Sequence, residues 1–104
     1  MVRLIALYSP PADAAAFDEH YRSVHAPIVA RYPGIRETRL TRLAGLGDRP
    51  ASHYLMAEMV FDSRADLDAA LASEAGRESG RDLRSFAQAG VTLFVADDEA
   101  PLDA

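Results

Sequence analysis

Two histidines and a proline lie close together in the first third of the chain, where apolar residues recur at helical spacing. His25 follows Tyr21 by one helical turn and Asp18 by two, so the three side chains share one side of that helix. Histidine titrates near neutrality and can pass a proton to and from an enol or hydroxyl group. Pro27 cannot donate a backbone hydrogen bond, so the helix is expected to loosen there and aim His25 at a cavity. His25 is therefore the predicted acid/base residue, with a structural bond to a freed carbonyl as the open alternative.

His20 precedes His25 by five residues, which places the two side chains on different sides of a regular α-helix. Chelating histidines on a helix are three or four residues apart, and the chain contains no cysteine, so no metal site is predicted. The lack of cysteine also excludes disulfides and thiolate nucleophiles, and the lack of lysine excludes Schiff-base chemistry. Gly45 and Gly47 do not have the spacing of a phosphate-binding loop. We therefore expect the protein to work without a cofactor.

Five further side chains are predicted to contact a substrate: Tyr21, His53, Tyr54, Glu58 and Arg3. His53 lies at a loop-to-strand junction from which it can reach the mouth of the same cavity, and Tyr54 can orient a substrate oxygen. Glu58 lies among apolar strand residues, where a carboxylate is costly unless it is paired or functional, and Arg3 is its natural partner. For each of these residues a structural role stays open: an exposed loop histidine, a tyrosine at the edge of the core, or an ion pair.

The spacing of apolar residues predicts the elements that must position these side chains. The first half is predicted to contain a strand over 2–8, a helix from Asp13 to Tyr32 and a partly wet edge strand over 35–43. The second half is predicted to contain a strand over 53–61, a helix capped by Ser63, an interrupted helix over 74–89 that Ser73 caps and that packs mainly through its second half, a strand over 91–96, and a frayed acidic end over 97–99. The first helix is expected to bury a stripe of five side chains, Phe17, Tyr21, Val24, Ile28 and Tyr32.

This βαββαβ order, with right-handed crossovers, predicts an α+β ferredoxin-like fold, a four-stranded antiparallel sheet with helices on one face. Three strands carry apolar residues at both parities, so the second face of the sheet would expose an apolar patch. Two sheets packed face to face would bury that patch, and a homodimer with a barrel-like interior is therefore predicted. By parity, Arg3, Tyr54 and Glu58 are expected to line this interior.

The length and composition of the chain limit the classes of function that the protein can have. At 104 residues the chain is expected to form one domain over 1–104. The net charge of -5 argues against a nucleic-acid partner, which needs a basic surface. The apolar start, Met1–Tyr8, is too short to span a membrane and lacks a signal-peptide cleavage pattern, so a cytoplasmic protein without a membrane partner is expected. Four arginines indicate either a solvated sheet edge or an attraction for a ligand that bears a carboxylate: Arg36, Arg39, Arg42 and Arg49.

Four stretches also match a known family: Leu4–Tyr8, Phe17-x-x-x-Tyr21-x-x-x-His25-Ala-Pro27, Tyr32-Pro-Gly34 and Ala57–Ser63. Through them the chain resembles the EthD family of dimeric α+β barrel proteins over nearly its whole length. The resemblance implies the ferredoxin-like fold and the homodimer. EthD-like proteins look like relatives of muconolactone isomerases, polyketide cyclases and cofactor-independent monooxygenases, which act on small, often aromatic or lactone-like compounds. Among the candidate residues, His25 is the one that the resemblance supports best.

The leading hypothesis is a cofactor-free lyase, isomerase or cyclase that binds a small hydrophobic carbonyl or phenolic compound and acts on it by proton transfer, with His25 as the acid/base. Whether the protein is an enzyme at all stays open at this point. One alternative is a non-catalytic protein that binds a small molecule or assists an oxidative degradation pathway. A second alternative is a cofactor-independent monooxygenase.

Overall fold

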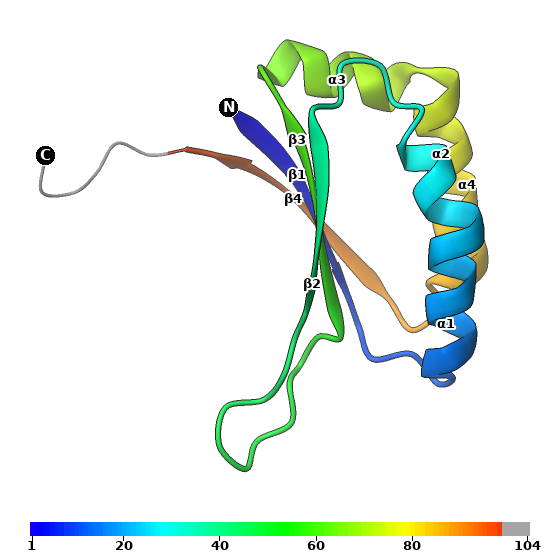
Figure 1. Ribbon diagram of the computed structural model, residues 1–104, viewed down its shortest axis with the longest axis vertical. Helices are drawn as coiled ribbons and strands as arrows, with labels where there is room; N and C mark the ends of the chain where they lie inside the picture. Colours follow the sequence, from blue (N-terminus) through cyan, green and yellow to red (C-terminus); the bar gives the residue numbers. More distant parts are fainter. Residues whose placement is uncertain (99–104) are drawn as a thin grey trace, which may run out of the picture.

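The computed structural model describes residues 1–98 of the chain, which form one antiparallel sheet with all of their helices on one face (Figure 1). The strands are β1 (Val2–Tyr8), β2 (Glu37–Arg42), β3 (Leu55–Phe61) and β4 (Val91–Asp97), and the helical segments are α1 (Ala14–His20), η1 (Tyr21–His25), α2 (Ala26–Val29), α3 (Arg64–Ala72) and α4 (Glu74–Phe86). The strand order β2-β3-β1-β4 places β1 and β3 in the centre and confirms the predicted α+β ferredoxin-like fold. None of the helices in residues 1–98 has the length and apolar character needed to cross a membrane.

The core lies between the two central strands and the helices. Successive side chains of a strand point to opposite faces, so alternate residues of β1 and β3 face the helical layer. Phe17 of α1 and Leu67 of α3 pack against them and are almost fully buried. The strand residues of this core are Val2, Leu4, Ala6 and Tyr8 in β1 and Leu55, Ala57, Met59 and Phe61 in β3.

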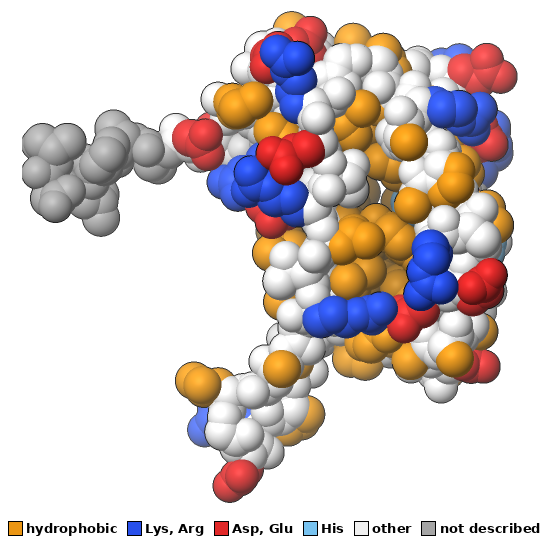
Figure 2. All heavy atoms as spheres, viewed as in Figure 1, with side chains coloured by type: hydrophobic (Ala, Val, Ile, Leu, Met, Phe, Trp, Pro, Cys, Tyr) orange, Lys and Arg blue, Asp and Glu red, His pale blue; other side chains and the backbone are white. Residues whose placement is uncertain are grey.

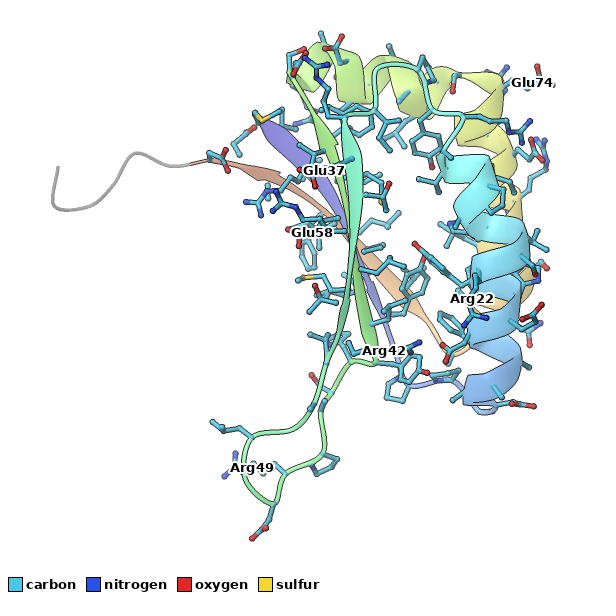
Figure 3. The ribbon with its side chains drawn as sticks, viewed as in Figure 1. Arg22, Glu37, Arg42, Arg49, Glu58 and Glu74 are labelled. Carbon is cyan, nitrogen blue, oxygen red and sulfur yellow. The ribbon has the colours of Figure 1, made fainter. Side chains whose placement is uncertain are left out.

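The opposite face of the sheet, which no helix covers, has an apolar centre and one ion pair. We call it the free face; its central residues are Arg3, Ile5, Leu7, Met56, Glu58, Val60 and Phe94, which the strand register places side by side. Arg3 Nη1 donates to Glu58 Oε2 at 2.9 Å, which confirms the predicted pair. Glu37 and Glu58 point away from the helices in Figure 3. The prediction that the strands carry apolar residues on both faces is therefore confirmed.

The first helix contains one wide π-helical turn, η1, between two ordinary α-helical segments. The backbone N–H of Ala26 donates to the carbonyl of Tyr21, five residues earlier, and Pro27 follows without an N–H of its own. The predicted loosening at Pro27 is thus confirmed. The extra residue in the turn shifts the buried stripe, so that Val24 is 41% exposed whereas His25 is 3% exposed. The prediction that Val24 is buried is wrong for this reason.

Two serines start the helices of the second half, as predicted. Ser63 Oγ accepts the N–H of Asp66, and Ser73 Oγ accepts the N–H of Gly76. The expectation of an interrupted helix that packs mainly through its second half is wrong, because α4 runs without a break from Glu74 and buries Gly76 in its first turn. Gly76 lies against the end of α3, where a Cβ atom would come within 2.3 Å of the Ala70 carbonyl oxygen.

The two edge strands, β2 and β4, bear on two further predictions. All residues of β2 are exposed, which confirms the predicted wet edge strand. The predicted frayed acidic end is wrong for Asp97, which belongs to β4, and Asp98 accepts a hydrogen bond from Arg3 at 3.4 Å. Glu99 lies outside the described residues.

The two glycines of α4 make a matched pair for a stability test. Gly76→Ala is expected to destabilise the protein by about 1–3 kcal/mol, because the added methyl group overlaps the backbone of α3. Gly80→Ala is expected to stabilise it by roughly 0.5–1 kcal/mol, because no atom lies within 4 Å of the new Cβ and alanine is the better helix former. Urea unfolding of both variants measures the two changes, and equal effects would contradict the packing described for Gly76.

Candidate functional site

One carboxylate joins both histidines of the first helix. Asp82 of α4 lies with Oδ1 2.8 Å from His20 Nε2 and with Oδ2 2.9 Å from His25 Nδ1. The prediction that the two histidines lie on different sides of the helix is wrong, because it assumed a regular α-helix. In the π turn the hydrogen bond spans five residues, which is the separation of His20 and His25, so both rings reach the same carboxylate.

The carboxylate determines which nitrogen of His25 is available for chemistry. A carboxylate oxygen accepts hydrogen bonds, so the Nδ1 atom that faces Asp82 carries the proton and Nε2 is the unprotonated nitrogen of the neutral ring. His25 has its one side-chain hydrogen bond in residues 1–98 through Nδ1, and the residue lines the cavity described below. Burial lowers the pKa of His25, an effect that Asp82 opposes and His20 reinforces. His25 is therefore neutral at pH 7 and able to accept a proton.

Aromatic rings hold the two imidazoles in place. The Phe86 ring lies 4.7 Å from the His20 ring and 4.9 Å from the His25 ring, measured between centroids. The Tyr21 ring also packs against His25, with 5.4 Å between the two ring centroids. Because these contacts restrict rotation of both imidazoles, the hydrogen bonds to Asp82 keep a fixed direction.

His25 lines a small cavity of about 90 Å³ between the helices and the sheet. Three tyrosines and a serine supply polar groups besides His25, and the Tyr32 and Ser79 hydroxyls are hydrogen-bonded to each other. Burial raises the pKa of Tyr21 to about 12 and also raises the pKa of Tyr8, so both phenols stay protonated at neutral pH. The polar lining residues are Tyr8, Tyr21, His25, Tyr32 and Ser79, and the apolar ones include Leu4, Ala6, Val29, Met59, Leu83 and Leu93.

A second hollow opens beside this cavity, at the edge of the sheet formed by β2. We call it the groove; it has a volume of about 250 Å³, and Figure 2 shows it as an apolar depression flanked by basic and acidic side chains. Arg22 and Arg42 point toward it from the helix and from β2 in Figure 3. Among the described residues, Tyr21 is the one that lines both the groove and the cavity. The groove is lined by Asp18, Tyr21, Arg22, Ala26, Leu40, Arg42 and Leu55.

Tyr54 lies beside the groove and not on the free face. Its hydroxyl donates to Asp18 at 2.9 Å, its ring packs edge-on against Phe17, and the Arg42 guanidinium lies 5.0 Å from the ring centroid. The prediction that Tyr54 shares a face with Arg3 and Glu58 is therefore wrong. The strand alternation used for that prediction fails because Tyr54 precedes the first residue of β3.

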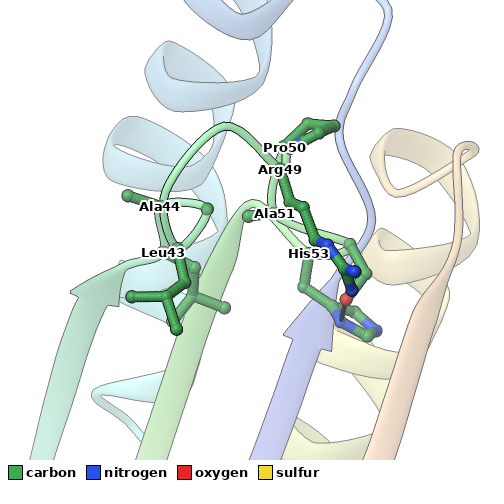
Figure 4. A pocket seen from close by; sticks show the side chains of 9 residues that line it. Leu43, Ala44, Arg49, Pro50, Ala51 and His53 are labelled. Carbon is green, nitrogen blue, oxygen red and sulfur yellow. Dashed lines mark hydrogen bonds between the residues drawn. The ribbon is translucent and has the colours of Figure 1, made fainter.

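The remaining predicted residues lie away from His25. Arg3 and Glu58 belong to the free face, so the sheet separates them from the cavity. His53 is in the β2–β3 hairpin loop, where its Nδ1 lies 3.0 Å from the Ser52 hydroxyl, and it borders a hollow of about 510 Å³ (Figure 4). That hollow is formed by the loop itself, from residues 43–46 and 49–53. The structure thus brings only Tyr21 to His25.

Asp82 was not predicted as a site residue, although its position carries a signal. It lies three residues after Ser79 and four before Phe86, so it shares the side of α4 that packs on the first helix. A carboxylate on the buried side of a helix requires a partner. The described residues 1–98 contain no cluster of three histidine, cysteine or acidic side chains arranged to hold a metal.

The lowered pKa of His25 predicts a pH-dependent stability. Between the folded and the ordinary pKa the unfolded chain binds a proton that the folded chain does not, so stability falls as the pH drops below about 6.5. The contribution of this one group is a slope of at most about 1.4 kcal/mol per pH unit. His25→Gln, which can still donate to Asp82, is expected to reduce the slope. Urea unfolding between pH 5 and pH 8 measures it, and equal slopes for the two proteins would contradict a buried neutral His25.

Comparison with known proteins places the chain among a group of small proteins. The EthD domain profile matches residues 9–90. An uncharacterized 11.0 kDa protein from the thcB–thcC intergenic region of Rhodococcus erythropolis is 38% identical over 102 residues, which cover 98% of this chain and 99% of that one.

Solved structures agree with this assignment. The crystal structure of an EthD family protein from Bacillus halodurans is 40% identical, with a TM-score of 0.89 over 95% of this chain and 99% of that one. SnoaB from Streptomyces nogalater, a cofactor-independent oxygenase, is 18% identical with a TM-score of 0.70 over 99% of this chain and 97% of its own, and shares the fold. From the profile match and the two relatives near 40% identity, the chain belongs to the EthD family.

Proposed function

We propose that the protein is a cofactor-free enzyme, a lyase, isomerase or cyclase, that moves a proton on a small hydrophobic carbonyl or phenolic compound. The observation that supports this proposal is the His25–Asp82 pair: a buried, neutral imidazole, oriented by a carboxylate through Nδ1, in a residue that lines a cavity. This is the arrangement of a general base that works near pH 7.

In the proposed reaction, His25 Nε2 takes a proton from the carbon beside a carbonyl group or from a phenolic hydroxyl. The imidazolium that forms is stabilised by Asp82, which already accepts the Nδ1 hydrogen bond. Tyr8 and Tyr21 keep their protons, so their hydroxyls can donate to the substrate oxygen on which negative charge develops. Return of the proton to another atom completes an isomerisation, and its use on a leaving group completes an elimination.

His20 has a positioning role in this proposal. Its Nε2 atom contacts the Asp82 oxygen that does not face His25, so the carboxylate is held from both sides. A carboxylate fixed in this way cannot rotate away from His25 during proton transfer.

The first activity test replaces His25. His25→Asn and His25→Gln are expected to lower turnover by about 10²–10⁴-fold on enolisable lactones or polyketide-like phenols, the usual contribution of a general base. Asp82→Asn is expected to cause a smaller loss, because the base remains but its orientation and its tautomer are no longer fixed. His53→Asn is the control, because His53 lies in the hairpin loop away from the cavity. Turnover that is unchanged in both His25 variants would refute the assignment.

A phenolate formed by the same base could instead react with molecular oxygen, which would make the protein a cofactor-independent monooxygenase. Oxygen uptake during turnover of a quinol-type substrate distinguishes this reaction from isomerisation. Ligand that binds tightly, with no product from any compound of the panel, would favour the non-catalytic alternative.

We also propose that two copies of the chain pair through their free faces. The support is the apolar centre of that face, where Ile5, Leu7 and Phe94 come from neighbouring strands and lie side by side. A patch of this kind in water indicates an interface, and sheets packed face to face bury it. Two structures with the same fold are described as dimeric ferredoxin-like proteins of unknown function, one from Jannaschia sp. and one from Thermobifida fusca.

The pairing predicts a specific effect of one substitution. Phe94→Glu is expected to convert a dimer into a monomer, because it puts a charge in the proposed interface. Phe94 is 49% exposed, so the folded chain itself tolerates the change. Val24→Glu, at a position that is 41% exposed on the helix, is the matched control and is expected to stay dimeric. Size-exclusion chromatography with light scattering measures the mass, and a monomeric wild-type protein would contradict the pairing.

A further inference from the structure

The groove at the β2 edge combines an apolar wall with two arginines, and this combination indicates a ligand class. Leu40 of β2 is 52% exposed, although its side chain lies on the sheet face that looks toward the helices. Leu55 and Ala26 continue the wall, and the Tyr21 ring closes its inner end. An exposed apolar surface that leads to the ring beside His25 suits the hydrophobic part of a small molecule.

The charges at the rim favour an anion. Arg22 and Arg42 line the groove together with a single carboxylate, Asp18. Asp18 accepts one hydrogen bond from Arg42 at 3.0 Å, and a guanidinium has five N–H donors, so Arg42 keeps donors for a ligand. Arg22 contacts Glu19 at 3.5 Å, and both side chains are 71% exposed, so this pair is weak. The chain as a whole is acidic, which makes the two cations at this opening a local exception.

We infer that the groove binds the carboxylate of a small aromatic or alicyclic acid, held by Arg22 and Arg42, with the ring of the ligand on Leu40 and Tyr21. The naming of this acid as a substrate rests on the proposed function, because the groove shares Tyr21 with the cavity of His25. The groove volume of about 250 Å³ is below the roughly 300–1,000 Å³ of pockets for drug-sized ligands, so the acid is small. Arginine suits this role because its planar group donates two parallel hydrogen bonds to a carboxylate.

The test compares two probes that differ in charge. Cinnamate and cinnamyl alcohol have the same ring and chain, but only cinnamate carries a carboxylate. Isothermal titration calorimetry is expected to detect cinnamate at low ionic strength, weaker binding of cinnamate as salt is added, and at least a roughly tenfold weaker affinity for the alcohol. Equal affinity for the two compounds, or no binding of cinnamate, would overturn the inference.

Substitutions then assign the effect to the two arginines. Arg22→Gln is expected to weaken cinnamate binding roughly threefold or more, without harm to folding, because Arg22 is largely exposed. Arg42→Lys keeps the charge and is expected to weaken binding less than Arg42→Gln, which also removes the partner of Asp18. Arg64→Gln is the control, because Arg64 lies on α3 and pairs with Asp68 at 3.1 Å. An equal loss in Arg22→Gln and Arg64→Gln would refute a specific role for the groove.

The same variants separate this inference from the proposed function. Cinnamate binding that depends on Arg22 but is accompanied by no turnover of any acid would support the groove and refute the enzyme. Turnover that depends on His25 but is equal for charged and neutral compounds, and unchanged in Arg22→Gln, would support the enzyme and refute the groove.

Discussion

The hydrogen bonds of the Asp82 carboxylate are the interaction on which the rest of the site depends. They join the first helix to α4 through His20 and His25, and all three groups are largely shielded from water. A buried carboxylate without partners would be costly, and so would a buried imidazole without one. The first helix and α4 are therefore held at the distance at which Asp82 can accept hydrogen bonds from both histidines. The cavity beside His25 lies between these helices and the sheet.

The sheet divides the molecule into two regions that are lined by different side chains. On the helical side lie the cavity and the groove, with His25 and the tyrosines that line them. On the other side lie the apolar residues of the free face with the pair of Arg3 and Glu58. Because side chains alternate along a strand, neighbouring residues of β1 and β3 belong to different regions. A substitution on one face of the sheet can therefore change that face while the side chains of the other face stay in place.

The fold could be predicted from the sequence because its signals are local and mutually consistent. Asp13, Ser63 and Ser73 cap helices where the pattern places them, and the alternation of β1 and β3 gives the right faces. The site could be predicted only in part, because it depends on contacts that no local pattern contains. His25 was identified from its type and from Pro27, whereas its partner Asp82 is 57 residues away. His20 was assigned to the wrong side since a regular helical period does not hold in η1.

The π turn changes which residues of this helix face the core. With a regular α-helical period through residues 21–25, Val24 would occupy the interior position and His25 would face solvent. The wide turn holds one more residue than an α-helical turn, so the imidazole of His25 takes the place in the core that the Val24 side chain would otherwise occupy. The geometry of the backbone, as well as the type of the side chain, therefore determines that a histidine lies in the interior.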